Sequence, residues 1–457
     1  MQLRNYQIEA VSKLRSSFSK FDAPLLVMPT GAGKTVVFCE IAKNATEKGN
    51  NVLILVHRRE LIKQASQKLA AIDVEHGIIA AGFKPKHSPV QVASVQTLIR
   101  RYDTLKWCPS IIIIDEAHHA IAGSWNKILN HWGEAKRIGV TATPIRLDGK
   151  GLKDFFDVII QGPSIPDLVA EGYLSPHRVF TAPLLPDLKK VRTRAGDYDI
   201  KQLDEVMSDK AIVGDAVEQY EKHAKGLQAV AFCVSIHHAN VVKDSFLKAG
   251  YKAAIITGDM KMDDRDQVIK DLTTGKIQIL VSIDVISEGF DLPLVSACIL
   301  LRPTQSLGLY MQQVGRILRP QPGKLAIVLD HVKNTIVHGF VDTPRKWDLK
   351  SKAKRKKPGE VAPRVTVCEA CYATYRPRPV CPVCGHEKEI KKKEIEQVEG
   401  DLVELKRDKP WLVGREKRDV EKAQARTLEA LQALGRKRGY KEGWAFMVYD
   451  MRKRKRR

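Results

Sequence analysis

The sequence of 457 residues lacks the two features that mark membrane and secreted proteins. Residues 1–5 form no apolar signal region, and the apolar runs are short. The four isoleucines at 111–114, for example, have the length of a buried strand and are far too few to cross a bilayer. We therefore expect a soluble, cytoplasmic protein with no membrane partner, and the length suggests about two to four domains.

Acidic residues are scarce relative to basic ones: 53 Asp and Glu stand against 76 Lys and Arg, and the net charge is +23. Residues 343–457 hold 33 basic and 17 acidic residues, so most of the excess lies in the last quarter of the chain. A basic tail on a milder core indicates a polyanionic partner, most often nucleic acid. A basic surface that serves only solubility is the alternative.

Apolar stretches alternate with polar, helical stretches in two regions of the chain. Alternation of this kind predicts parallel sheets with helices on both faces, so the expected fold class is α/β with two sheet domains of similar size. The expected strands of the first domain cover residues 25–28, 52–56, 90–93, 111–114 and 137–140. Those of the second domain cover residues 229–234, 253–256, 277–281, 297–301 and 326–329.

A glycine-rich stretch follows the first expected strand and reads Met-Pro-Thr-Gly-Ala-Gly-Lys-Thr, starting at Met28. Gly31 and Gly33 allow a tight turn that aims backbone N–H groups at phosphate oxygens, and the helix that follows adds its positive dipole end. In such a loop Lys34 contacts the β- and γ-phosphates and Thr35 binds Mg²⁺. Met28 stands where the usual pattern has its first glycine, but the strand before the loop and the helix after it favour an ATP site.

Two adjacent acidic residues, Asp115 and Glu116, follow the four isoleucines. They lie at the carboxyl end of a buried strand, which is where open α/β sheets hold their ligands. Downstream of a phosphate loop, this position predicts that Asp115 binds Mg²⁺ and that Glu116 polarises an attacking water. The predicted chemistry is therefore hydrolysis of ATP.

Further motifs complete a pattern that resembles the superfamily 2 helicases of the DEAD/DEAH-box class. The resemblance covers about residues 1–335. The motifs that carry it are residues 4–7 (the adenine-reading segment), 56–64 (motif Ia), 94–98 (the next strand-contact motif), 115–119 (the acidic motif), 141–144 (motif III), 232–235 (motif IV), 281–293 (motif V) and 312–319 (motif VI). The resemblance implies two RecA-like domains with a nucleotide site between them.

That resemblance also implies roles for motif VI and the end of the acidic motif. Arg316 and Arg319 would reach the γ-phosphate from the second domain, and Gln312 would help to order the attacking water. Arginine suits this role because its planar fork binds phosphate oxygens in pairs. His118 would couple the γ-phosphate to motif III, whereas His119 is more simply a packed or exposed histidine. The alternative for the two arginines is a surface salt bridge.

The residues expected to bind nucleotide come from both domains, and Gln7 among them would read the adenine edge. The full set is Arg4, Gln7, Thr30, Gly31, Ala32, Gly33, Lys34, Thr35, Gly289, Asp291, Arg316 and Arg319. In family members, loops of both domains also lie along the phosphates of one strand, which positions that strand without reading its sequence. The candidates for such contacts are Arg58, Ser94, Gln96, Gly258 and Ser282. Ordinary loop polarity is the alternative for each of them.

Only four of the eight cysteines form a pattern. Cys368, Cys371, Cys381 and Cys384 make two CxxC pairs separated by nine residues, which predicts a small ribbon that holds a structural Zn²⁺ through four thiolates. His386 as a substitute ligand and a disulfide are the alternatives, although nothing in the sequence suggests the secretion that favours disulfides. The remaining cysteines read as reduced core residues; they are Cys39, Cys108, Cys233 and Cys298.

The expected domains follow from these motifs and from breaks in composition. They are residues 1–160 (RecA-like domain 1, binding ATP), 161–222 (a connector with a helical part), 223–342 (RecA-like domain 2), 343–364 (a basic linker), 365–390 (the zinc module) and 391–457 (a charged, helical, basic region). In the last of these, apolar spacing predicts a helix within residues 415–435, with Gly435 as its stop. The aromatic residues that follow would pack against this helix.

Helicase core, four-cysteine module and basic tail together resemble the RadD-like branch of bacteria and their phages. This resemblance implies an ATP-dependent DNA helicase or translocase that acts in repair, recombination or replication restart. It also suggests a single-strand-binding or replication protein as partner, and a monomeric motor. An ATP-gated clamp that unwinds nothing and an RNA helicase are the alternatives, because the core motifs are shared by all three.

Overall fold

The computed structural model describes residues 2–119, 123–146, 151–181, 186, 188, 191–194, 196–208, 210–283, 294–350, 365–388, 421, 422, 424, 425, 427–440 and 443–454. Contacts divide the chain into two units, residues 1–389 and 390–457. The first unit carries both sheet domains and the cysteine module. None of the described helices is long and apolar enough to cross a membrane.

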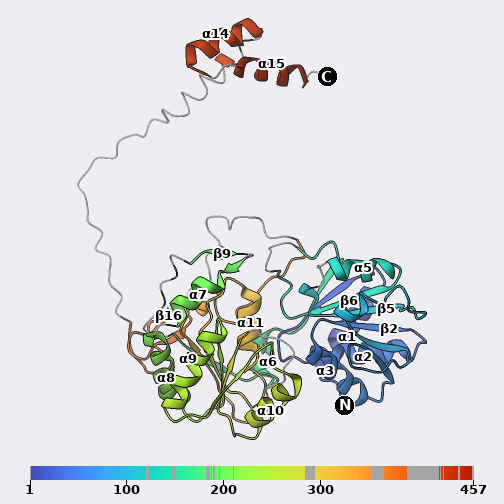
Figure 1. Cartoon of the computed structure of the whole chain (residues 1–457), viewed down its shortest axis with the longest axis vertical. Coiled ribbons are helices and arrows are strands. Elements are labelled where there is room, and N and C mark those ends of the chain that lie inside the picture. The colour runs from blue at the N-terminus through green and yellow to red at the C-terminus, as the bar shows by residue number, and fades with distance from the viewer. Residues whose placement is uncertain are drawn as a thin grey trace. The chain divides into compact units, whose positions relative to one another are not determined.

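The first domain is built on a seven-stranded sheet with the order β3-β4-β2-β5-β6-β1-β7, in which all neighbours run parallel (Figure 1). The central strands are apolar on both faces, because helices cover both. Helices α1 (Asn5–Ser17), α2 (Lys34–Thr46) and α3 (Arg59–Ala70) pack on one face, and α5 (Gly123–His131) packs on the other. The strands are β1 (Pro24–Val27), β2 (Val52–Val56), β3 (His76–Ile79), β4 (Val90–Ser94), β5 (Ile111–Asp115), β6 (Lys136–Thr141) and β7 (Val158–Gln161).

The second domain has an eight-stranded sheet with the order β12-β13-β11-β14-β15-β8-β17-β16. The first six strands run parallel, whereas β17 pairs antiparallel with β8 and β16 pairs antiparallel with β17. Its strands are β8 (His177–Thr181), β11 (Ala229–Phe232), β12 (Ala253–Ile256), β13 (Ile279–Ser282), β14 (Ala297–Leu300), β15 (Ala326–Asp330), β16 (Thr366–Val367) and β17 (Ala373–Tyr375). Its main described helices are α8 (Lys210–Ala224), α9 (Ile236–Lys248), α10 (Met262–Thr273) and α11 (Leu307–Gly315).

The segment that the sequence suggests as a connector, residues 161–222, does more than join the two sheets. It contributes β8, which lies between β15 and β17, and also the small hairpin β9 (Thr193–Arg194) with β10 (Asp197–Tyr198). Helix α8 at its end packs against the second sheet. The second domain therefore begins near residue 177, inside the expected connector. The strand gives little signal in the sequence, because it has only five residues and starts with His177 and Arg178.

The cysteine module and the start of the expected basic linker are both attached to folded domains. The module joins the second sheet through β17, and Thr181 donates or accepts a hydrogen bond of 2.7 Å with Thr374 across that pairing. Leu349 packs in the apolar core on one face of the first sheet, and its carbonyl accepts a hydrogen bond of 2.7 Å from the backbone N–H of Leu152. The chain thus returns to the first domain after completing the second.

The second unit contains a helical hairpin, α14 (Leu428–Arg438) and α15 (Trp444–Arg454). Leu431 of α14 packs against Ala445 and Val448 of α15. The predicted stop at Gly435 is wrong: α14 continues past it and ends at Gly439, whose φ of 68° is the left-handed conformation that glycine adopts easily. Gly435 is instead buried, and a Cβ at this position would lie 3.5 Å from the Trp444 ring. The expected helix positions Val420 and Ala423 lie outside the described residues.

Candidate functional site

The glycine-rich loop joins β1 to α2 at the carboxyl edge of the first sheet. Gly31 and Gly33 have φ values of 88° and 78°, both in the left-handed region, and α2 begins directly after them at Lys34. A Cβ on Gly33 would lie 2.5 Å from Nε2 of Gln7, so the site also requires the absence of a side chain. The first-turn N–H groups of α2 are consequently directed to a space in which a phosphate can lie.

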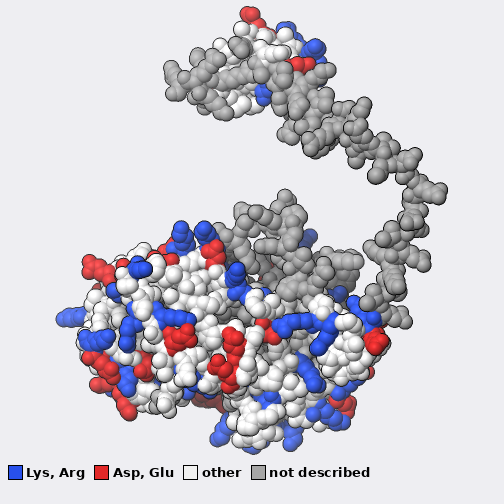
Figure 2. Space-filling model, turned by 180° about the vertical axis from the view of Figure 1, so that it is seen from behind, with Lys and Arg blue, Asp and Glu red and all other residues white. Residues whose placement is uncertain are grey.

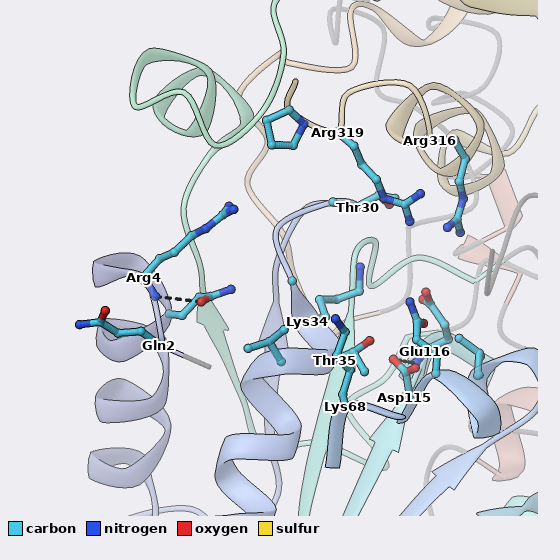
Figure 3. A pocket seen from close by; sticks show the side chains of 17 residues that line it. Gln2, Arg4, Thr30, Lys34, Thr35, Lys68, Asp115, Glu116, Arg316 and Arg319 are labelled. Atoms are coloured by element: carbon cyan, nitrogen blue, oxygen red, sulfur yellow. Dashed lines mark hydrogen bonds between the residues drawn. The ribbon is translucent and has the colours of Figure 1, made fainter. Parts of the chain in front are cut away.

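Asp115 is the last residue of β5, and the buried isoleucines before it fix its position. Asp115 and Glu116 are only 4% and 7% exposed. The Glu116 backbone N–H donates a hydrogen bond of 2.9 Å to Oδ1 of Asp115. Glu116 itself has a φ of 47°, which is uncommon for a residue with a Cβ. This turn directs both carboxylates toward Lys34 and Thr35 (Figure 3).

His118 connects the acidic pair to the neighbouring strand β6. Its Nδ1 lies 3.5 Å from Oε2 of Glu116 and 3.0 Å from Oγ1 of Thr141. The Thr141 hydroxyl in turn donates to the carbonyl of Thr143 over 3.1 Å. A continuous polar chain therefore runs from Glu116 into residues 141–144. His119 packs its ring 4.5 Å from the ring of His57 and 4.1 Å from that of His118.

The second domain closes the site from the opposite side with Arg316 and Arg319, which follow α11. Both side chains extend toward Lys34 and the carboxylates (Figure 3). Arg316 is 5% exposed. Gly315 allows the close approach, because a Cβ there would lie 2.6 Å from Cβ of Thr30 in the glycine-rich loop. The two domains thus meet at the glycine-rich loop.

These groups enclose a cavity of about 460 Å³ between the two domains. The cavity is lined by Gln2, Arg4, Gln7, Thr30, Gly31, Gly33, Lys34, Thr35, Val36, Leu61, Gln64, Lys68, Asp115, Glu116, Arg316, Arg319 and Pro320. Burial lowers the pKa of Lys34; the carboxylates of Glu116 and Asp115 oppose this shift, and Arg316 and Arg319 add to it. A ligand that carries several negative charges would offset this crowding of cations.

Most of the nucleotide-binding candidates therefore lie in one cavity, and four of the expected residues require comment. Ala32 contributes its carbonyl, which accepts hydrogen bonds from the Tyr6 hydroxyl at 3.1 Å and from Gln7 Nε2 at 3.3 Å. Gln312 is 4% exposed and does not line the cavity. Gly289 and Asp291 lie outside the described residues.

The side chain of Gln7, which was expected to contact the adenine, is hydrogen-bonded to the glycine-rich loop. Its Oε1 accepts a hydrogen bond of 3.0 Å from the Arg4 backbone N–H, while its Nε2 donates to the carbonyl of Ala32. An amide has a second N–H and further lone pairs, so its outer edge still lines the cavity. The Arg4 guanidinium lies 4.6 Å from the centre of the Tyr173 ring. This contact joins the Gln7 end of the cavity to the segment that follows β7.

Six residues of the cavity wall were not predicted from the sequence. Leu61, Gln64 and Lys68 lie on α3 at spacings of three and four residues, which place them on one helix face. That spacing was visible in the sequence, but which face turns toward the cavity depends on how α3 packs. The others are Gln2, Val36 and Pro320.

The candidates for strand contact lie at the carboxyl edges of the two sheets. The Ser94 hydroxyl donates a hydrogen bond of 2.7 Å to Oε1 of Gln96. Nε2 of Gln96 donates one of 2.9 Å to the carbonyl of His57, the residue before Arg58. These bonds join the loops after β2 and β4 into one surface. On the second domain Gly258 follows β12, whereas Ser282 at the end of β13 is completely buried at 0% exposure.

The four patterned cysteines converge: their Sγ atoms all lie within 4.8 Å of one another. Cys368 and Cys384 are 3.6 Å apart, and Cys371 and Cys381 are 3.7 Å apart. A disulfide would require about 2 Å. Four thiolates at about 2.3 Å from one Zn²⁺ in a tetrahedron are separated by about 3.8 Å, so the donor set and its spacing fit zinc.

Comparison with known proteins agrees with this geometry. Residues 1–146 match the family described as type III restriction enzyme, res subunit, and residues 211–321 match the helicase conserved C-terminal domain. A 51.5 kDa protein of Lactococcus phage (isolate 7-9) is 35% identical over 392 residues, which are 84% of each chain. The chain belongs to superfamily 2 of the helicases. As a member, it is an ATP-hydrolysing enzyme.

Two other relatives of this helicase carry names of motors. IRC3 of Saccharomyces cerevisiae, which bears the name of an ATP-dependent helicase, is 33% identical over 76% of this chain and 54% of its own length. The DNA 3′-5′ translocase XPB2 of Sulfurisphaera tokodaii is 24% identical over 73% of this chain and 82% of its own. The chain thus spans about half the length of the yeast relative.

Solved structures show the same fold. A fragment assigned to the HsdR subunit of a type I restriction enzyme from Vibrio vulnificus YJ016 superposes with a TM-score of 0.59 at 21% identity, covering 73% of this chain and 65% of that one. At this identity the likeness concerns the fold alone, which is that of two RecA-like domains in tandem.

Proposed function

We propose that this helicase is an ATP-driven motor on DNA. The observation that carries the proposal is one cavity lined from both sides: by the glycine-rich loop and two carboxylates of the first domain, and by Arg316 and Arg319 of the second. Hydrolysis at such a site changes how strongly the two domains attract each other. The spacing between the strand-contacting loops of the two domains then changes with each cycle.

Each charged group has a separate task in this scheme. Lys34 and the N–H groups of the glycine-rich loop hold the β- and γ-phosphates. Thr35 and Asp115 are the ligands for Mg²⁺, which neutralises phosphate charge when it is bound. Glu116 polarises the attacking water, and its 3.5 Å approach to His118 connects that step to residues 141–144.

Arg316 and Arg319 act on the same phosphate from the second domain. Negative charge builds on the γ-phosphoryl oxygens in the transition state, and buried guanidinium groups stabilise it there. Because these side chains come from the other domain, they reach the phosphate only when the cleft is closed. Gln312, which precedes them on α11, is buried and does not line the cavity as it stands; in this scheme it helps to order the attacking water in the ATP-bound site.

The four cysteines hold a structural Zn²⁺ in this proposal. All four ligands come from the protein, so no coordination position is open for catalysis. The module that they close continues the second sheet through β17, and zinc therefore stabilises an edge of the motor domain itself.

DNA is favoured as the track by the names of the relatives and by charge. Figure 2 shows acidic and basic side chains interspersed on one face of the first unit, whereas most of the excess of basic residues belongs to residues 343–457. Arg58, Ser94, Gln96 and Gly258 are the proposed strand contacts of the core. Ser282 is too deeply buried for this role.

The cellular task that fits a RadD-like architecture is DNA repair, recombination or replication restart. A single-strand-binding or replication protein is the partner class that such a task requires. A monomer is the assembly that we propose, since one chain supplies both halves of the nucleotide site.

Steady-state ATP hydrolysis without nucleic acid, and then with single-stranded DNA, duplex DNA, forked DNA and single-stranded RNA, tests the proposal. Stimulation by DNA above RNA supports it, and displacement of a labelled strand then separates a helicase from a translocase. Hydrolysis that is stimulated by RNA alone, or by no nucleic acid, contradicts the DNA motor. Stimulation without movement on DNA would identify an ATP-gated clamp.

A further inference from the structure

The three most exposed aromatic side chains among the described residues all lie in the small second unit. Tyr440, Phe446 and Tyr449 are 40%, 56% and 40% exposed. Two methionines of the same helix, Met447 and Met451, are 57% and 51% exposed. Single exposed apolar side chains are common on any protein, but five within twelve residues indicate a surface that binds a partner.

The packing of the hairpin fixes where these side chains lie. Ala445 and Val448 are the buried residues of α15 and contact Leu431 of α14, so only a narrow stripe of α15 is covered. Residues three or four apart share a helix face, so Phe446 and Tyr449 flank this stripe on one side. By the same rule Met447 and Met451 form a second, separate apolar flank.

Tyr440 lies on the methionine side of α15, because it packs on Trp444, which shares a helix face with Met447 and Met451. Its ring centre lies 4.5 Å from that of Trp444, and its backbone N–H donates a hydrogen bond of 3.0 Å to the carbonyl of Gly435. Trp444 lies over Gly435, where a Cβ would be 3.5 Å from the indole ring, an ordinary packing distance. The junction between α14 and α15 is therefore packed on this side, and Phe446 and Tyr449 alone form the aromatic flank on the other.

The charge around these rings is strongly positive. Residues 421–457 hold twelve Lys and Arg against four Asp and Glu. Arg436 and Lys437 are exposed in the last turn of α14, whereas Arg438 beside them is paired with Glu421 at 2.5 Å. Exposed rings set among cations are the combination that binds single-stranded nucleic acid, because bases stack on the rings while phosphates approach the cations.

We propose that the α14–α15 hairpin is a second nucleic-acid-binding site, which takes unpaired bases on Phe446 and Tyr449 and phosphates on the exposed cations Arg436 and Lys437. The site rests on the proposed function, since it would hold the motor on its track. It differs from the core in what it recognises. The loops of the core contact the sugar-phosphate backbone of a nucleic-acid strand. The hairpin instead requires unpaired bases that are free to stack.

The test is binding of the full-length protein, without nucleotide, to labelled oligothymidine and to a blunt duplex of equal length. Phe446→Ala combined with Tyr449→Ala should weaken binding of the single strand by about tenfold or more and leave duplex binding within about twofold, because paired bases cannot stack on a side chain. Phe446→Trp with Tyr449→Trp should restore single-strand binding. Circular dichroism and thermal melting confirm that the variants remain folded.

Two further variants separate stacking from other causes. Met447→Ala with Met451→Ala removes as much exposed apolar surface from the other flank, and it should change neither affinity. Arg436→Gln and Lys437→Gln together, which leave the Arg438–Glu421 pair intact, should weaken single-strand and duplex binding alike and reduce the slope of affinity against salt.

Three outcomes overturn the inference. Unchanged single-strand binding in the aromatic variant excludes the hairpin as a stacking site. Equal losses from the aromatic and methionine variants indicate an apolar docking face for a protein, a second copy or the motor core. Equal losses on single strand and duplex indicate a purely electrostatic tail. ATP hydrolysis by the wild-type chain is measured in parallel with and without DNA. Stimulation by DNA supports the proposed motor even where the hairpin variants contradict the second binding site.

Discussion

Six strands of each sheet of the motor follow the same order. The two domains differ in the loop that follows β1 or its counterpart, and in the strand that pairs with it on its outer side. In the first sheet the order is β3-β4-β2-β5-β6-β1, and in the second it is β12-β13-β11-β14-β15-β8. By this correspondence β8 is the counterpart of β1. The glycine-rich loop follows β1, whereas a segment with no Gly-Lys-Thr follows β8. One scaffold therefore carries the proposed phosphate loop in the first domain and supplies Arg316 and Arg319 to the same cavity in the second.

The neighbour of these two strands differs as well. β1 pairs with β7, a parallel strand of its own domain, while β8 pairs antiparallel with β17 of the cysteine module. An exposed edge strand invites unwanted pairing, and both domains have covered this position. The first domain does so with β7, which follows β6 along the chain, and the second with β17 of the cysteine module. The function of each domain thus depends on loops and edges, whereas the common core provides their placement.

Replacing Lys34 by Ala should give the largest effect, because the phosphate loop has no counterpart in the second domain. Hydrolysis should fall at least about a hundredfold, while binding of DNA persists. Lys68→Ala is the matched control: it removes another cation of the same cavity, from α3, and should cost less than about tenfold. A variant at position 34 that hydrolyses ATP normally would show that this loop is not the phosphate site.

Replacing Arg316 by Ala tests the contribution of the second domain. We expect the turnover number to fall by about a hundredfold and the affinity for a fluorescent ATP analogue to change by less than about threefold, because the arginine stabilises charge that develops only in the transition state. The conservative change Arg316→Lys should not restore turnover, since a point charge cannot bind two phosphate oxygens as the guanidinium fork does. If affinity and turnover fell together, Arg316 would already bind ATP in the ground state, as the residues of the first domain do.

Cys381→Ser should distinguish the two sheet edges. Bound zinc, measured by elemental analysis, should be lost, and hydrogen exchange in β17 and β8 should accelerate by at least about tenfold. Exchange in β7 and β1 should stay unchanged, since no metal supports that edge. Cys298→Ser, which alters a buried cysteine of β14 outside the cluster, is the control for loss of a thiol. Faster exchange at both edges would mean that the variant unfolds the whole motor.

The smallest effect is expected at two ion pairs that join the domains between α3 and α10. Arg265 NH1 lies 2.7 Å from Oε1 of Glu60, with both side chains only 14% and 13% exposed, and Lys63 Nζ lies 2.8 Å from Oδ2 of Asp266 at the surface. Glu60→Gln should raise the KM for ATP by about fivefold, because it leaves a largely buried guanidinium without its anion in the closed cleft. Lys63→Ala should change it by less than about twofold, as exposed pairs contribute little.

A charge reversal provides the control for this pair. Glu60→Arg alone should impair closure, and Glu60→Arg together with Arg265→Glu should recover most of the affinity. Failure of the double variant to recover would indicate that Glu60 acts on something other than Arg265.

The sequence predicted those parts of the site that are encoded over a few consecutive residues. Gly31, Gly33 and Lys34 form a loop whose geometry follows from local chemistry, and Asp115 was placed by the isoleucines before it. The cysteines converge because two CxxC turns can close on one ion. In these cases the information lies within the motif, so no knowledge of the tertiary packing was required.

Where packing decides, the sequence was insufficient. β8 was missed because its position between β15 and β17 comes from pairing with distant strands rather than from its five residues. Lys68 faces the cavity only because α3 packs as it does. Ser282 looked like a loop residue, yet its side chain is enclosed by the second sheet. At Gly435 the helix stop was placed too early: α14 continues and ends four residues later at Gly439, where φ is 68°.

The close approach of the two domains at Gly315 restricts which residue can stand there. A Cβ at position 315 would come within 2.6 Å of Cβ of Thr30, so this spacing of the two domains is open only to glycine. Any larger residue at position 315 would hold the two walls of the nucleotide cavity further apart or displace the glycine-rich loop.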